Sequence, residues 1–146
     1  MKKVVLTTDG ACIGNPGPGG WAALLRFGRH EKLLTGGEKD TTNNRMELQA
    51  VIEGLAVLKE RCDVTIVTDS KYVMNAFEQG WFDKWQDNGW KTAAKDPVKN
   101  RELWEELAER LERHKITWKW VKGHAGHDDN EAVDKAARDA ASKQAY

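Results

Sequence analysis

The order of secondary-structure patterns along the chain predicts an α/β fold built on a mixed β-sheet. Strand-like runs open the chain, helical spacing of apolar residues begins near residue 44, and strand and helix patterns alternate from there to the end. Strands joined by tight turns pair antiparallel, whereas strands separated by a helix pair in parallel through a crossover. We therefore expect antiparallel hairpins first and crossover helices after them.

The first three strands are predicted from β-branched or apolar runs separated by breaks that contain glycine. These runs are KVVLTTD (residues 3–9), GWAALLRFG (20–28) and EKLLTGGEKD (31–40). Glycine-containing breaks between strand patterns are typical of hairpin turns, so the three runs predict an antiparallel meander.

The remaining elements alternate between helix and strand. From residue 44 apolar residues recur every three or four positions, which predicts an amphipathic helix ending near Lys59. DVTIVTD (63–69) is the next strand, and Ser70 is a typical N-cap for a helix that carries Tyr72. The pattern then predicts a helix over 103–111, a strand KITWKWV (115–121) in which apolar and polar residues alternate, and an alanine-rich helix over 131–142. The apolar stripes of these last elements place Trp104, Trp118 and Trp120 in the core.

Length and composition indicate one intracellular domain. A chain of 146 residues is long enough to bury a core, so residues 1–146 are treated as a single domain. Cys12 and Cys62 lie far apart and lack the spacing of metal ligands, which predicts reduced thiols. The chain has neither a signal-peptide pattern nor 18 consecutive apolar residues. We expect a cytoplasmic monomer with no membrane partner.

Two predicted strands end at carboxylates, Asp9 and Asp69. If these strands are parallel neighbours, both acids lie at the same end of the sheet, where like charges raise each other's pKa unless a cation lies between them. Hard divalent cations such as Mg²⁺ bind oxygen ligands of this kind. Each acid also has a simpler interpretation, since Asp9 with Gly10 is typical of a hairpin turn and Asp69 of a helix cap.

Two further acids are equally open to interpretation. Glu47 follows Asn44 by three residues, which is the spacing of a capping box, and it also lies at the rim of the apolar helix face. Asp134 has Arg138 four residues later, which is typical of an exposed ion pair. Taken singly, none of the four acids identifies a site.

The motifs TDGACIGNPGPGGW, TTNNRMEL, TDSKYV and WVKGHAGHDDNEAVDKAA occur in this order, and over residues 3–141 the chain strongly resembles the bacterial type 1 ribonucleases H. The resemblance implies a three-layer ribonuclease H-like fold, whose five-stranded mixed sheet has three antiparallel strands followed by two parallel ones, with flanking helices. It also implies an endonuclease that cuts the RNA strand of RNA/DNA hybrids, using Mg²⁺ or Mn²⁺, and leaves 5′-phosphate and 3′-hydroxyl ends.

The resemblance also assigns roles to the acidic residues. The family's metal-binding carboxylates carry over to Asp9, Glu47, Asp69 and Asp134, and its loop histidine to His124. Two metal ions can clamp an in-line displacement at phosphorus, and we expect Asp9, on the first and central strand, to bridge both ions. His124 is expected to move protons or help product leave, although its glycine-rich loop is also typical of a solvated histidine. A zinc site with His127 is disfavoured, because no other nitrogen or sulfur ligands lie nearby.

The glycine-rich stretch after Asp9 is expected to contact the hybrid. Small residues let the backbone approach a groove, while Pro16 and Pro18 remove donors and so disfavour a phosphate-binding nucleotide loop. By resemblance, the residues that line the groove are Cys12, Asn15, Asn43 and Asn44, with Thr42 near the DNA phosphates. Asparagine is appropriate there because its side chain offers both donors and an acceptor.

Residues 80–100 interleave tryptophan with lysine and resemble the family's basic protrusion, which grips the DNA strand. The expected contact residues are Trp81, Lys84, Trp85, Trp90 and Lys91. A small helical hairpin with mutually packed tryptophans is the alternative, and both can hold. The whole chain balances 23 basic against 23 acidic residues, so any contact with a polyanion is local. Within this segment Asp83, Asp87 and Asp96 dilute the lysines, so we expect a shallower salt dependence of hybrid binding than a lysine-dense segment would give.

Two other classes of protein remain possible at this point. Integrases and Holliday-junction resolvases share this type of sheet with acidic clusters, and their activity would be cleavage of DNA duplexes. A non-catalytic hybrid-binding module is the second class, but it would have lost at least one of the four acids, and all four are present.

Overall fold

The computed structural model describes residues 1–122 and 128–145. In chain order the elements are β1 (Lys2–Cys12), β2 (Gly17–Phe27), β3 (His30–Thr41), α1 (Asn43–Ala56), β4 (Cys62–Thr68), α2 (Lys71–Glu78), α3 (Trp81–Asn88), α4 (Arg101–Glu112), β5 (Lys115–Trp120) and α5 (Asp128–Gln144). Each strand and helix expected from the sequence is present, and α3 is an additional short helix within residues 80–100.

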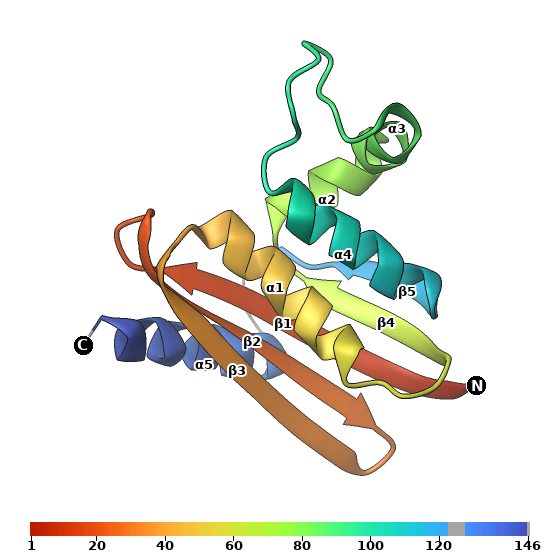
Figure 1. Ribbon diagram of the computed structural model, residues 1–146. Helices are drawn as coiled ribbons and strands as arrows, with labels where there is room; N and C mark the ends of the chain where they lie inside the picture. Colours follow the sequence, from red (N-terminus) through yellow and green to blue (C-terminus); the bar gives the residue numbers. More distant parts are fainter. Residues whose placement is uncertain (123–127, 146) are drawn as a thin grey trace.

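The strands form one five-stranded sheet in the order β3-β2-β1-β4-β5. β1 pairs antiparallel with β2, and β2 with β3, whereas β4 pairs in parallel with both β1 and β5. Figure 1 shows α1 on one face of the sheet and α5 on the other, with α4 packed beside α1. The predicted three-layer architecture, with three antiparallel strands followed by two parallel ones, is confirmed.

Apolar side chains fill the space on both faces of the sheet. The larger cluster lies between the sheet, α1 and α4, and it includes Leu6, Ile66 and Trp104. The smaller cluster joins β2 to α5 through small and medium side chains such as Leu24 and Val133. Trp104 is fully buried, as predicted. Trp118 and Trp120 are only half-buried against this core, because β5 is an edge strand.

The caps of α1 and α2 fix where these helices begin. The Thr42 hydroxyl accepts a hydrogen bond from the Arg45 N–H at 3.3 Å, so Thr42, and not Asn44, is the N-cap of α1. The capping-box interpretation of Glu47 is therefore wrong, since that position of the box falls on Arg45. The helix ends at Ala56, three residues earlier than the spacing predicts. Ser70 caps α2 as expected, because its hydroxyl accepts from Val73 N–H at 3.2 Å.

Two expectations from composition concern thiols and membranes. Cys12 and Cys62 are both free thiols, in agreement with the sequence. Among the described helices, none combines the length and the apolarity needed to cross a lipid bilayer.

Candidate active site

The central strands β1 and β4 separate at one end of the sheet, and two carboxylates lie there. The parallel ladder of β1 with β4 ends at Thr7 and Val67, whereas the antiparallel ladder of β1 with β2 continues to Cys12. Asp9 pairs with Ala22 inside that longer ladder, which excludes the hairpin-turn interpretation. Asp69 directly follows β4. Strands that diverge in this way open a crevice at their ends, which is a common place for a site in α/β sheets.

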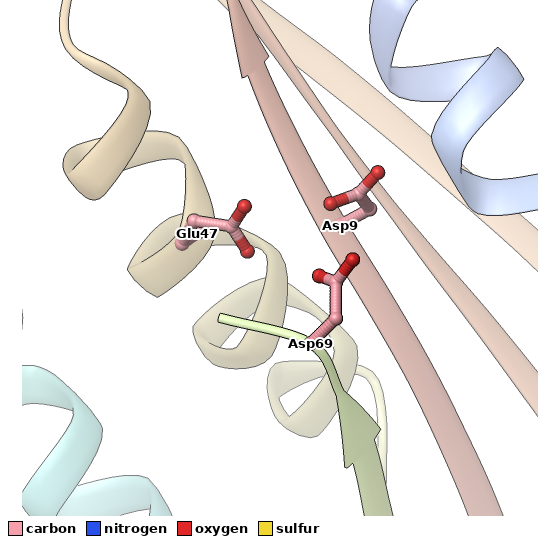
Figure 2. Close-up of side chains that lie close together, drawn as sticks. All are labelled: Asp9, Glu47 and Asp69. Carbon is pink, nitrogen blue, oxygen red and sulfur yellow. The ribbon is translucent and has the colours of Figure 1, made fainter. Parts of the chain in front are cut away.

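Helix α1 brings a third carboxylate to the same place because it packs very closely against β1. A Cβ atom added at Gly10 would lie 2.6 Å from the backbone nitrogen of Glu47 and 2.7 Å from the carbonyl carbon of Met46. These distances are far below an ordinary contact, so only glycine allows this approach. Figure 2 shows the result, in which Glu47 from α1 points toward Asp9 and Asp69.

The three carboxylates form a tight and largely buried group. One oxygen from each of Asp9, Glu47 and Asp69 lies within 4.8 Å of the other two. Asp9 is 4% exposed and Glu47 is 6% exposed. Burial raises the pKa of Glu47 well above its ordinary value, and the nearby Asp9 and then Asp69 carboxylates raise it further.

The donor set fits a divalent cation. The buried Oε2 atom of Glu47 has no hydrogen-bond partner among the described residues. A buried carboxylate oxygen without a partner is unfavourable, and clustered like charges add to that cost. A hard cation such as Mg²⁺ relieves both, because it takes oxygen ligands and supplies the opposite charge. Asp9, Glu47 and Asp69 can therefore hold such an ion.

The group opens into a groove of about 390 Å³, which we call the carboxylate groove. Its lining comprises Asp9, Gly10, Asn43, Asn44, Glu47, Asp69, Ser70, Lys71, Tyr72 and Asp134. Asp134 reaches this groove from α5 and also forms the ion pair with Arg138 that the sequence suggests, at 3.0 Å. The four acids of the prediction thus come from four separate elements or their ends to one groove.

Some of the predicted substrate residues line the carboxylate groove, and others lie beside it or elsewhere. Asn43 and Asn44 line the carboxylate groove. Asn15 is hydrogen-bonded to the first of them, because its Oδ1 accepts a hydrogen bond from the backbone N–H of Asn43 at 3.0 Å. Thr42 caps the same helix. The half-buried Cys12 turns its thiol inward and donates to the carbonyls of Gly17 and Thr41, so its contact with the hybrid stays a prediction. His124 and His127 lie outside the described residues.

A second groove of about 380 Å³, here called the aromatic groove, lies beside the first. Its lining comprises Tyr72, Trp81, Trp85, Thr92, Asp96, Pro97, Val98 and Lys99. The rings of Trp81 and Trp85 lie 6.3 Å apart, so the predicted packing between them occurs while both also face the groove. Trp90 packs edge-on against the buried Phe82, which gives it a role in holding the segment together. Lys84 and Lys91 are exposed.

Tyr72 is a residue that sequence reasoning placed only on a helix, yet it lines both grooves. Nothing in its local pattern indicates this, because the other residues of the second groove lie between 9 and 27 positions away in the sequence. Only the folded chain brings Tyr72 between the two grooves.

A mixed sheet with carboxylates gathered where its central strands separate defines an α/β protein with a divalent-cation site, the kind of site used by metal-dependent phosphoryl-transfer enzymes. A family model described as RNase H matches residues 1–142. The chain therefore belongs to the RNase H family and is an enzyme of the ribonuclease H class.

Individual relatives support the same conclusion. A Ribonuclease H of Thermus thermophilus is 60% identical over 144 residues, which is 99% of this chain and 87% of that protein. A Ribonuclease H of Hydrogenovibrio crunogenus is 62% identical over 140 residues, which is 96% of each chain. A crystal structure of a type 1 RNase H with a type 2 active-site motif is similar to this fold, with a TM-score of 0.86 and 32% identity. That similarity covers 99% of this chain and 74% of that one.

Proposed function

We propose that the chain cuts the RNA strand of RNA/DNA hybrids at the carboxylate groove, with two Mg²⁺ ions, or Mn²⁺ in their place, and leaves 5′-phosphate and 3′-hydroxyl ends. One observation carries the proposal: three carboxylate oxygens lie within 4.8 Å of one another in a groove that Asn43 and Asn44 also line. Ion ligands and side chains able to recognise a sugar are therefore within one groove.

The carboxylates are proposed to hold the ions. Asp9, Glu47, Asp69 and Asp134 line the groove, and Asp9 lies on the central strand between the other contributing elements. When bound, two ions supply Lewis-acid chemistry that activates the attacking water and stabilises the leaving 3′ oxygen. The chain's own contribution is to fix the carboxylates on packed elements and to bury one side of the site.

Recognition of the RNA strand is assigned to the start of α1. A minor groove of A-like shape is recognised through 2′-hydroxyl and phosphate contacts. Asn43 and Asn44 offer amide donors and carbonyl acceptors for such contacts, and Asn15 supports Asn43 through its backbone. Thr42 and Cys12 are proposed to contact the substrate at the edge of this region, and His124 to move protons or assist product release.

The DNA strand is assigned to the aromatic groove. Trp81 and Trp85 present faces on which sugars or bases can pack, and Trp81 is 44% exposed. Lys84 and Lys91 are exposed and can pair with phosphates, while Trp90 stiffens the segment through Phe82. This places the two proposed strand contacts in adjoining grooves that share Tyr72.

One labelled duplex, prepared as RNA/DNA, RNA/RNA and DNA/DNA, tests the proposal. With Mg²⁺ we expect only the RNA of the hybrid to be cut, with no cutting in EDTA, and the product ends are read by ligation and tailing. Asp9→Asn and Asp134→Asn should bind hybrid without cutting it. Asp139→Asn is the matched control, because it removes a carboxylate from the exposed pair with Lys135 on the same helix. Cleavage of the DNA duplex, or hybrid binding without cleavage under either metal, contradicts the proposal.

A further inference from the structure

The hydroxyl group of Tyr72 links α2 to the start of α4. It accepts a hydrogen bond from Asn100 Nδ2 at 3.1 Å and another from Trp104 Nε1 at 3.0 Å. Trp104 is fully buried, and its ring lies 5.5 Å from that of Tyr72. The donor of Trp104 therefore has a partner inside the core, and Asn100 is tied to the same oxygen.

The side chain of Asn100 extends the link to α1. Its Oδ1 accepts from Arg45 Nη1 at 3.2 Å, and Arg45 also pairs with Glu102 at the start of α4. Asn100 has a left-handed backbone conformation, with φ of 61°, at the point where residues 80–100 rejoin α4. Its amide thus connects α1 and α2 where this protruding segment ends.

These bonds lie between the two grooves. Tyr72 lines both of them, and Arg45 is two residues before Glu47 on α1. Val98 and Lys99, which precede Asn100, form one wall of the aromatic groove. Asn100 therefore lies between that wall and the helix that carries Glu47.

We propose that Tyr72 is a positioning residue, whose hydroxyl acts through Asn100 to hold the aromatic groove in a fixed place relative to the carboxylate groove. The inference rests on the proposed function, because it matters only for a hybrid that lies on both grooves. Fixing the segment before binding avoids the entropy cost of ordering it during binding. Loss of the Tyr72 hydroxyl is expected to raise KM for hybrids that span both grooves and to leave kcat nearly unchanged.

Tyr72→Phe tests the link, because it removes the hydroxyl and keeps the ring. KM is measured with hybrids of increasing length. For the wild-type protein, KM should fall with length until the hybrid reaches both grooves, and hybrids at or above that length are called spanning hybrids. The variant loses both hydrogen bonds of the hydroxyl, and the one with Asn100 is the bond that connects to the aromatic groove. Losing that bond predicts a rise in KM of about three- to tenfold for spanning hybrids, and a smaller rise for hybrids confined to the carboxylate groove. Glu105→Gln is the control, since it breaks only the exposed pair with Arg101 on α4.

Asn100→Gly is the second variant, because glycine accepts the left-handed backbone that Asn100 has. If Tyr72 acts through Asn100, the double variant has the KM of Asn100→Gly alone. Additive effects, an equal rise in KM at all hybrid lengths, or an effect confined to kcat would overturn the proposal.

Amide hydrogen exchange in the free protein gives a readout that needs no substrate. Exchange across residues 81–99 should be faster in Tyr72→Phe than in the wild type, while exchange in β1 and β4 stays the same. Unchanged exchange in that segment would refute the inference. If the wild-type protein cuts no hybrid, the proposed function fails, and this measurement still decides whether the hydroxyl holds the segment.

Discussion

Gly10→Ala is the substitution that most directly tests how the site is built. The new Cβ would lie 2.6 Å from the backbone nitrogen of Glu47, whereas ordinary contacts begin near 3.4 Å. Because backbone atoms of both α1 and β1 are involved, no side-chain rotation relieves the clash, and α1 must move by about 0.8 Å. Overpacking of this kind costs about 1–3 kcal/mol of stability.

The displacement falls on Glu47, whose carboxylate is proposed to hold a metal ion. A misplacement of about 1 Å can reduce an enzyme's rate about 100-fold, so we expect a loss of that order in kcat. The free energy of unfolding is measured by urea denaturation, and hybrid cleavage is measured under conditions where the variant is fully folded.

Gly54→Ala is the matched control for this experiment. It lies on the same helix, and its Cβ would lie 2.5 Å from Leu6 Cδ1, the end of a side chain that can shift. We expect Gly54→Ala to perturb stability while leaving kcat within a fewfold of wild type. If folded Gly10→Ala cuts hybrids at the wild-type rate, close packing at Gly10 does not position Glu47 and the reasoning is refuted.

Three further predictions concern metal, pH and salt. Mg²⁺ at about 100 times its Kd should raise the unfolding free energy of the wild type by about 2.7 kcal/mol, and Asp9→Asn should gain much less in the same urea titration; an equal gain would place the ion elsewhere. Burial, and then Arg61 and Arg113, lower the pKa of His114, whose Nδ1 accepts the Cys62 N–H at 3.1 Å. As pH falls, His114 is therefore protonated in the unfolded chain at a higher pH than in the folded protein. The free energy of unfolding should then fall as pH drops below about 6.5, and His114→Phe should flatten that pH dependence. For hybrid binding, the slope of log Kd against log salt should be shallower than a lysine-dense segment would give, and it should steepen in the double variant Asp83→Asn, Asp87→Asn. A slope that both substitutions leave unchanged would count against contact between this segment and the hybrid.

Local sequence patterns predicted most of the fold but left the role of Asp9 and Gly10 open. The dipeptide has the composition of a turn, and nothing nearby in the chain excludes one. What places it inside β1 is pairing with residues around Ala22, more than ten positions later. The role of Gly10 depends on contact with Glu47, which is further away still. Such long-range contacts are absent from any local pattern.

Element ends and degrees of burial were also less predictable than element types. Apolar spacing continues to Leu58, but α1 ends at Ala56, and Leu58 N–H bonds to Leu55 in the turn that follows. Alternation correctly predicted that Trp118 and Trp120 face the core, but full burial depends on the strand's place in the sheet. β5 lies at an edge, and sequence alternation cannot distinguish an edge strand from an inner one.

Helix α1 carries both the amides proposed to recognise the hybrid and one of the carboxylates proposed to hold metal. Asn43 and Asn44 precede Glu47 by four and three residues, so both lie on its side of the helix, and all three line one groove. The close approach at Gly10 sets how deep this face lies against β1, and Arg45 ties the same helix to Asn100. Any shift of α1 therefore moves the amides proposed to recognise the sugar together with the Glu47 carboxylate. Substitutions that displace this helix should consequently change substrate preference and rate in the same variant, whereas Asp69→Asn, at the end of a strand, should reduce the rate alone.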